Sequence, residues 1–295
     1  MKLQIAGHTL DLSVTRVMGL IPVLENDDRP VSDYVDTAKK MVAAGADFVE
    51  VGIRTAENST FMPSEETELE RLIPVIRAIG DECRTFVGVC TSYPAVMEKA
   101  NAAGASFIVD PNALRTAGAI EMAARLHVPV VLCDPGSSEG DLDDPVSRLQ
   151  EFFYERVDAC LNGGMNRRNL IIDPLMGNPK RLDATLKMLG RISTFKSFAL
   201  PLSAAIPAAL PYLKLASDET DAVTLSVALY TATRGVCIIR TTEVSRIAMA
   251  LAAWQMVNET ARPHQLSKGI VRRFIAMRDL IRERLGHVVK NKSKE

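Results

Sequence analysis

The chain has 295 residues, of which 47% are hydrophobic and 24% are charged, an ordinary composition for a globular protein with one large core or two smaller ones. Lys and Arg (35) nearly balance Asp and Glu (36), so no overall charge draws the protein to nucleic acid or to an anionic membrane, and we expect neither as a partner. Apolar runs such as Ile206 to Leu215 are too short or too interrupted to span a bilayer, and Met1 to Leu12 lacks the apolar centre of a signal peptide, which together predict a cytoplasmic protein.

The predicted elements begin with a short β-hairpin at Leu3 to Leu12, whose alternating residues flank Ala-Gly-His and are expected to cap the floor of the fold. A small unit then recurs: a helix ends in small residues and Gly, and a short apolar run follows that closes on a charged residue. Its copies are AAGADFVEVG (43–52), AAGASFIVD (102–110), NGGMNRRNLIID (162–173) and TRGVCIIR (233–240). Gly adopts the left-handed conformation after a helix without steric cost, and such apolar runs suit strands buried on both faces. Each copy therefore predicts a helix, a tight turn and a parallel strand.

The intervals between these copies complete an alternation of strands and helices. Four further strands are predicted at 16–24, 85–91, 129–134 and 195–203, and helical periodicity occurs at 31–44, 65–79, 94–103, 146–162 and 243–260. Eight alternating strands without a break in composition favour a closed (β/α)₈ TIM barrel, of the α/β class, over an open doubly wound sheet. No Gly-x-Gly-x-x-Gly follows the first barrel strand, which argues against a dinucleotide-binding fold. We predict the hairpin over 1–12, the barrel over 13–262, and an extra C-terminal helix with a basic tail over 263–295.

Polar residues stand at most of the predicted strand ends. They are Glu50, Cys90 with Thr91, Asp110, Cys133 with Asp134, Asp173, Ser203 and Arg240. The chemistry of such barrels lies at the carboxyl ends of the strands, and an inward carboxylate is costly to bury unless it meets a donor, a cation or a ligand. The set therefore predicts a binding site, while the alternative is that its members lie on an exposed rim or pair with one another.

Two of these residues are the leading candidates for ligand contacts. Asp173 ends an apolar strand, and its carboxylate can accept two hydrogen bonds from an amidine-like edge of a heterocycle, an edge that pterins present. Arg240 can hold a phosphate or stack on a ring, or it can form an ion pair with Asp173 or Glu50. The cysteines are five, scattered and without a CxxC pair, so we expect packing thiols, and we predict no metal site.

Several motifs together resemble dihydropteroate synthase and the wider pterin-binding family, from Val17 to about Trp254. They are RVMGLIPV, AAGADFVEVG followed by SEETELERLIPVIRAI, FIVDPNALR, HVPVVLCD, NRRNLIIDPLMGNPK and RGVCIIRTTEV. The resemblance implies a barrel that binds a pterin or folate-like small molecule, with no certain cofactor. The enzyme of that family condenses hydroxymethyl-dihydropterin diphosphate with p-aminobenzoate.

The family's functional residues are only partly present. The residues that match its motifs, and that the resemblance implies as substrate contacts, are Asp173, Gly177, Lys180, Arg240 and Thr91. Other polar positions of the family are occupied by Pro22, Cys90, Val109, Ala205 and Thr242, and the segment expected as GGESTRPG is GIRTAENST. Preorganised donors stabilise a departing diphosphate, and the loss of one typically costs about 2.7 to 4 kcal/mol. We therefore expect no ordinary dihydropteroate synthase activity.

Three hypotheses about function stay open at this point. The first is a diverged transferase that binds a pterin-like or other flat polar molecule, with Asp110, Asp134 or Glu50 as candidate acid or base groups. The second is a catalytically silent homologue that binds a metabolite or a partner subunit, and the third is a folate-dependent methyltransferase, which the resemblance also allows. Family members commonly dimerise through late barrel helices, which here are 221–232 and 243–260. We therefore expect a homodimer.

Overall fold

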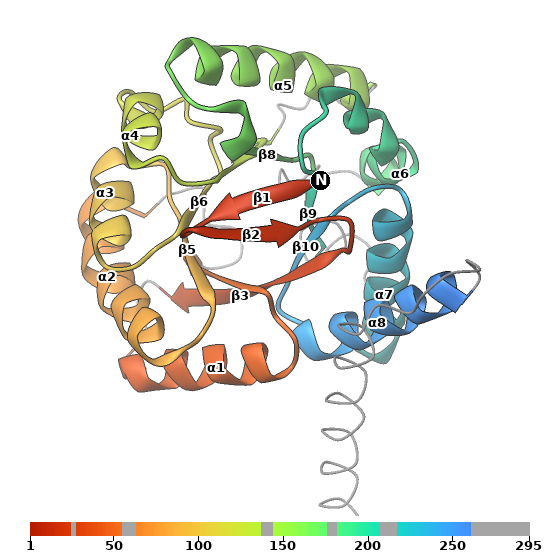
Figure 1. The fold of residues 1–295 in the computed structure, drawn as a ribbon, viewed down its shortest axis with the longest axis horizontal. Helices are drawn as coiled ribbons and strands as arrows, with labels where there is room; N and C mark the ends of the chain where they lie inside the picture. The colour runs from red at the N-terminus through yellow and green to blue at the C-terminus, as the bar shows by residue number, and fades with distance from the viewer. Residues whose placement is uncertain (25–27, 55–62, 137–143, 176–181, 207–216, 261–295) are drawn as a thin grey trace, which may run out of the picture.

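The computed structural model describes residues 1–24, 28–54, 63–136, 144–175, 182–206 and 217–260. Eight parallel strands surround a central axis and helices cover their outer faces (Figure 1). The barrel strands are β3 (Arg16–Leu24), β4 (Phe48–Arg54), β5 (Phe86–Cys90), β6 (Phe107–Asp110), β7 (Val130–Cys133), β8 (Leu170–Asp173), β9 (Ser203–Ala205) and β10 (Ile238–Thr241). The helices are α1 (Val31–Ala43), α2 (Glu65–Glu82), α3 (Pro94–Ala102), α4 (Ala119–Leu126), α5 (Pro145–Asn162), α6 (Leu182–Gly190), α7 (Ser217–Thr233) and α8 (Val244–Thr260). Two short 3₁₀ helices are η2 (Arg167–Asn169) and η3 (Ile192–Phe198).

The strand order confirms the predicted barrel. Hydrogen-bonded neighbours run β8-β7-β6-β5-β4-β3-β10-β9, and all of these pairs are parallel. A parallel bridge between Ile172 of β8 and Leu202, the residue before β9, nearly closes the cylinder. The strands predicted at 16–24, 85–91 and 129–134 are confirmed as β3, β5 and β7.

Strand alternation divides the apolar residues into two cores. One core fills the barrel and contains Met18, Phe48, Phe107, Val131 and Ile171. The other core lies between the strands and the helices. It contains the strand residues adjacent in sequence to those of the first core, such as Val17, Val49 and Ile108. Because successive side chains of a strand point to opposite faces, each residue's position relative to its neighbours determines which core it enters.

The predicted N-terminal hairpin is confirmed, and it closes the amino end of the barrel. Its strands β1 (Lys2–Ile5) and β2 (His8–Asp11) are antiparallel, and the turn at Ala6 and Gly7 has positive φ at both residues (45° and 76°). Leu3 and Ile5 are buried against the inner core. Since apolar side chains fill this end, a site inside the barrel can open only at the carboxyl ends of the strands.

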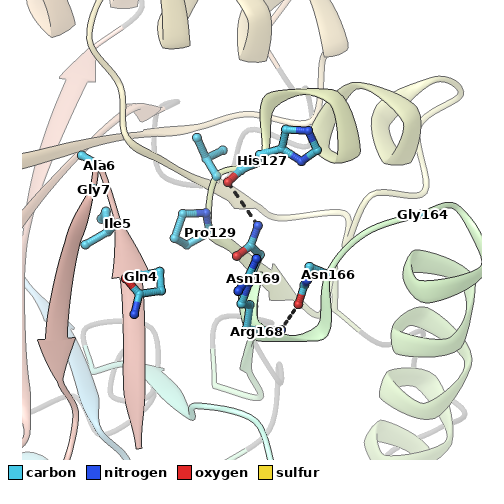
Figure 2. Close-up of a pocket in the computed structure, with 11 residues that line it drawn as sticks. Gln4, Ile5, Ala6, Gly7, His127, Pro129, Gly164, Asn166, Arg168 and Asn169 are labelled. Atoms are coloured by element: carbon cyan, nitrogen blue, oxygen red, sulfur yellow. Dashed lines mark hydrogen bonds between the residues drawn. The ribbon is translucent and has the colours of Figure 1, made fainter.

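A groove of about 550 Å³ lies beside the hairpin, between its turn and η2 (Figure 2). At its floor, Asn169 Nδ2 donates to the carbonyl of His127 over 3.1 Å. The groove is at the amino end of the barrel, so its residues are remote from the polar strand ends.

One predicted strand is wrong over most of its length. Residues 195–203 were expected to be extended, but Phe195 and Phe198 belong to η3 and only Ser203 is in β9. Both rings pack edge-on against Phe153 of α5, with centroids 6.1 and 6.2 Å apart. A short apolar run is equally compatible with a buried helix, and here the contacts with α5 select the helical form.

Two further expectations concern the end of the chain and the membrane. The C-terminal helix and basic tail predicted over 263–295 lie outside the described residues. None of the helices in the described ranges combines the length and the apolar character needed to cross a bilayer.

Candidate functional site

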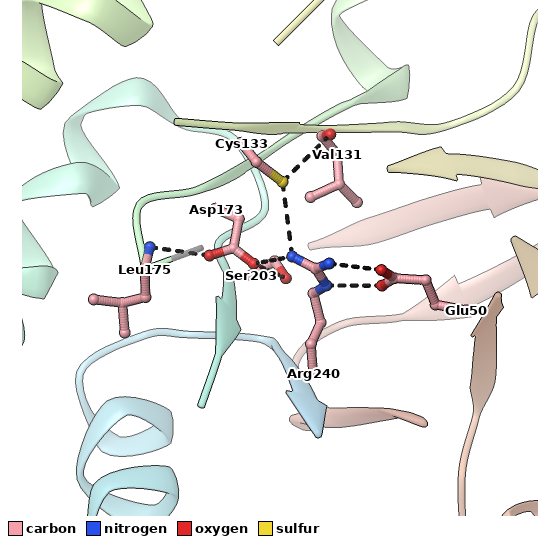
Figure 3. A network of polar contacts seen from close by, with 7 residues as sticks. All are labelled: Glu50, Val131, Cys133, Asp173, Leu175, Ser203 and Arg240. Carbon is pink, nitrogen blue, oxygen red and sulfur yellow. Dashed lines mark hydrogen bonds and ion pairs between the residues drawn. The ribbon is translucent and has the colours of Figure 1, made fainter. Parts of the chain in front are cut away.

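Three charged side chains and one hydroxyl meet inside the carboxyl end of the barrel (Figure 3). They are Glu50 of β4, Asp173 of β8, Ser203 of β9 and Arg240 of β10. Glu50, Asp173 and Arg240 each follow, by two residues, a side chain of the inner core, namely Phe48, Ile171 and Ile238. The strand period of two therefore directs all three toward the barrel axis.

Arg240 is the centre of this cluster. Its Nε and Nη2 donate to the two oxygens of Glu50 over 2.9 and 2.8 Å, and its Nη1 donates to Asp173 Oδ2 over 2.8 Å. The Arg240 side chain is 1% exposed. Burial opposes its charge, but the negative charges of Glu50 and Asp173 outweigh burial and raise the pKa of the guanidinium well above its ordinary value. Arg240 is therefore a fixed cation held by two carboxylates.

Asp173 is held by donors on both of its oxygens. Oδ1 accepts from the backbone N–H of Leu175 over 3.0 Å, and Oδ2 accepts from Ser203 Oγ over 3.0 Å in addition to Arg240. The residue is fully buried. A buried carboxylate is stable only when its oxygens are hydrogen-bonded, and these three donors meet that requirement.

The wall beside Arg240 is formed by thiols and an aliphatic side chain. Cys133 Sγ lies 3.7 Å from Arg240 Nη1, and Val109 is buried in the same inner core, with Cys90 packed against it. Burial raises the pKa of both thiols well above the ordinary value, and the charges of Glu50 and Arg240 act on them in opposite directions. Both groups stay protonated, so they are neither anions nor nucleophiles near neutral pH.

Asp110 and Asp134, two of the predicted acid or base candidates, lie away from this cluster. Asp110 accepts from Ser92 Oγ (2.5 Å), from Asn112 N (2.7 Å) and from Leu114 N (3.0 Å). Asp134 is gripped by Arg148 of α5, with N–O distances of 2.7 and 3.3 Å. Each aspartate follows an inward-pointing residue by one position and so turns to the side of the helices. The structure brings Glu50 together with Asp173 and Arg240, but not these two.

Thr91 also faces the helices. It donates a short hydrogen bond to Glu68 of α2, and its oxygen accepts from the N–H of Tyr93 over 3.1 Å. Glu68 is 3% exposed, and its burial raises its pKa to about 7, an effect that the Thr91 hydrogen bond reduces and the charge of Asp110 reinforces. Sequence reasoning missed Glu68, although it precedes the buried Leu72 by one helical turn and so occupies an apolar position of α2.

The other predicted substrate contacts, and the residues that replace polar groups of the family, lie at or beyond the strand ends or outside the described residues. Gly177 and Lys180 lie outside the described residues. Ala205 is buried and pairs in register with Arg240, Pro22 is half-buried at the end of β3, and Thr242 is exposed just beyond β10. Among the described residues, no group of three or more His, Cys, Asp or Glu side chains is arranged to hold a metal ion.

Comparisons with known proteins agree with the geometry. A family described as pterin binding enzyme matches residues 27–242, which is well over half of the chain. The chain belongs to this pterin-binding family. The dihydropteroate synthase of Escherichia coli K12 is 30% identical to it over 266 residues, covering 85% of this chain and 94% of the relative.

Solved structures of the same family have the same barrel. The dihydropteroate synthase of Stenotrophomonas maltophilia is 32% identical, with a TM-score of 0.78, and the match covers 89% of this chain and 99% of that one. The dihydropteroate synthase of Xanthomonas albilineans in complex with 7,8-dihydropteroate is 29% identical, with a TM-score of 0.78 and coverage of 88% and 99%. The pterin-binding fold inferred from the motifs is confirmed.

Proposed function

We propose that this pterin-binding-family barrel binds a pterin-like or similarly flat, donor-bearing small molecule at the carboxyl ends of its strands. The observation that carries the proposal is Asp173, a fully buried carboxylate aimed at the barrel axis and held in place by Leu175 N and Ser203. A carboxylate fixed in this way suits the paired N–H groups of an amidine-like edge. The Xanthomonas albilineans relative, described with 7,8-dihydropteroate, supports a ligand of this class.

The proposal includes the absence of ordinary dihydropteroate synthase activity. Inside the carboxyl end of the barrel, the cation Arg240 is already held by two carboxylates. Ala205 and Pro22 supply no cation beside it. A diphosphate leaving group needs positive charge and donors where its negative charge develops, and each missing donor costs about 2.7 to 4 kcal/mol.

The geometry favours a catalytically silent binding protein over a diverged transferase. An acid or base group has to exchange a proton with its substrate, so at least one of its oxygens must be accessible. Both oxygens of Glu50 accept from Arg240, and both oxygens of Asp134 face Arg148. Asp110 is completely buried and accepts three hydrogen bonds. These carboxylates are better suited to structural hydrogen bonds and ion pairs than to transferring protons.

The experiment is a thermal-shift screen with pterins, folates and phosphorylated metabolites, followed by calorimetric titration of each hit. A ligand at a hundred times its dissociation constant raises the stability by about 2.7 kcal/mol. Asp173→Asn should weaken a pterin-like hit by roughly 1.5 to 3 kcal/mol, the range for a hydrogen bond to a charged group. Asp47→Asn is the control, because Asp47 is a partly buried carboxylate paired with Arg16 at the amino ends of the strands (3.1 Å). Equal effects of the two substitutions, or no pterin among the hits, would contradict the proposal.

The proposal also includes a cytoplasmic homodimer. Trp254 and Val257 of α8 are 39% and 64% exposed, which is unusual for large apolar side chains. Trp254 borders a groove that also contains Leu251 of α8 and Ala232 of α7. An apolar surface on two late helices supports pairing of two copies through this face.

A further inference from the structure

The acceptor capacity of Asp173 limits how a flat ligand can bind. A carboxylate offers about four acceptor positions, two on each oxygen. Leu175 N occupies one position on Oδ1, while Ser203 Oγ and Arg240 Nη1 occupy Oδ2. A heterocycle that presents two parallel N–H groups needs a position on each oxygen, so one of the two donors on Oδ2 has to give way.

Arg240 is the donor that can leave without becoming unpaired. Its Nε and Nη2 stay on Glu50 when Nη1 releases Asp173, because the two sets of hydrogen bonds use different nitrogens. Bidentate pairing with a carboxylate is strong, and a buried guanidinium that lost all its carboxylates would be highly unfavourable. Glu50 therefore lowers the free energy needed to break the hydrogen bond between Arg240 Nη1 and Asp173.

The same residue sets the charge of the site. Among the described side chains of the cluster, Glu50 and Asp173 carry two negative charges against one positive charge on Arg240, and all three are at most 6% exposed. The neighbouring thiols of Cys90 and Cys133 stay neutral. Charges in a buried site are little screened by salt, so a second anion near Arg240 meets a net negative cluster.

We propose that Glu50 is the specificity-determining residue of this site. Glu50 holds Arg240 away from the ligand, so that Asp173 can accept hydrogen bonds from an uncharged, donor-bearing heterocycle. Binding of phosphorylated forms is thereby disfavoured. This inference rests on the proposed function, because it concerns the same site. On this inference, the ligand is an unphosphorylated pterin rather than the pterin diphosphate.

The experiment compares two probes, hydroxymethyl-dihydropterin and its diphosphate, by calorimetric titration of the full chain. The wild-type protein should bind the uncharged probe more tightly. Glu50→Gln removes the negative charge and one half of the bidentate grip, so Arg240 stays on Asp173 and competes with the ligand. The uncharged probe should then bind about tenfold more weakly, equivalent to about 1.4 kcal/mol, and the diphosphate at least about tenfold more tightly. Asp47→Asn should change neither dissociation constant.

Glu50→Asp provides a second test that does not depend on the folding of Glu50→Gln. It keeps the negative charge but is one methylene shorter, so it cannot reach Arg240 in the same bidentate geometry. It should weaken the uncharged probe while still disfavouring the diphosphate.

The outcomes separate the two proposals. If neither probe binds the wild-type protein, the proposed function fails. If Asp173→Asn weakens the uncharged probe but both Glu50 variants keep the wild-type affinities and their ratio, Glu50 has no part in specificity and the inference alone is overturned. A wild-type preference for the diphosphate would also overturn it.

Discussion

The replacement Glu68→Gln should abolish part of the pH dependence of stability. Glu68 is buried in α2 against Thr91, and burial raises its pKa from an ordinary value of 4.5 to about 7. The folded protein therefore retains this proton over a pH range in which the unfolded chain has lost it. Since the folded state binds more protons in this window, stability falls as the pH rises from about 4.5 and the loss is complete above about 7.

The magnitude follows from the difference between these two pKa values. Each pKa unit corresponds to about 1.36 kcal/mol, so the contribution that disappears between about pH 4.5 and pH 7 is on the order of 3 kcal/mol. Gln has the shape of the protonated side chain and can hydrogen-bond to Thr91 without a charge. Glu68→Gln should therefore differ least from the wild-type protein at about pH 5 and should exceed it in stability by up to about 3 kcal/mol near pH 8.

The assay is urea unfolding of both proteins at several pH values between about 5 and 8. The pKa of Asp110 is also raised by burial, but that residue is present in both proteins and its contribution largely cancels in the difference. Glu98→Gln is the control, because Glu98 is exposed and pairs with an exposed Arg125. A stability difference between Glu68→Gln and the wild-type protein that stayed constant over this pH range would refute the reasoning.

Three further predictions concern the cluster, the reaction and the assembly. Arg240→Met should destabilise the protein by about 3 to 5 kcal/mol in chemical unfolding, because it leaves Glu50 and Asp173 buried without their cation; a loss below about 1 kcal/mol would show that the cluster is solvated. The gene should not rescue growth of a cell that lacks dihydropteroate synthase, and purified protein should form no dihydropteroate; robust rescue would mean that other residues have taken over the missing roles. Trp254→Glu should convert a dimer to a monomer in light scattering while leaving the circular dichroism spectrum unchanged, and a wild-type monomer would contradict the assembly proposal.

The buried cluster of Glu50, Asp173 and Arg240 differs from a phosphate-binding site, in which the donors of an arginine are free to bind an anion. A bidentate pair such as Glu50 and Arg240 occupies the donors that would otherwise hold an anion, and the third contact, to Asp173, occupies the acceptor that would hold a heterocycle. Binding therefore requires the cluster to rearrange. The free energy of that rearrangement decides both the affinity and the choice of ligand.

The sequence alone was sufficient to predict the barrel, because the signals that define it are local. The Gly residues after the helices, such as Gly45, Gly104 and Gly235, have positive φ in the structure, as the predicted turns require. The apolar runs that follow them, including 170–173, are buried strands because both of their faces are covered. The motifs of the pterin-binding family span most of these elements, and so the family could be inferred before any coordinates.

Tertiary structure decided which side chains meet. Asp110 and Asp173 both end apolar strands, yet the side chain of Asp110 points toward the helices and that of Asp173 toward the barrel axis. Side chains alternate along a strand, so the direction of the last one depends on the strand's position relative to its neighbours. Phe195 and Phe198 were predicted as part of a strand, and contacts with α5 made them helical. Glu50 and Arg240 are 190 residues apart, and only closure of the barrel brings β10 beside β3, one strand from β4, so that the two side chains pair. The chain sets the local conformations through short-range sterics and patterning, whereas long-range packing sets the partners of each buried charge.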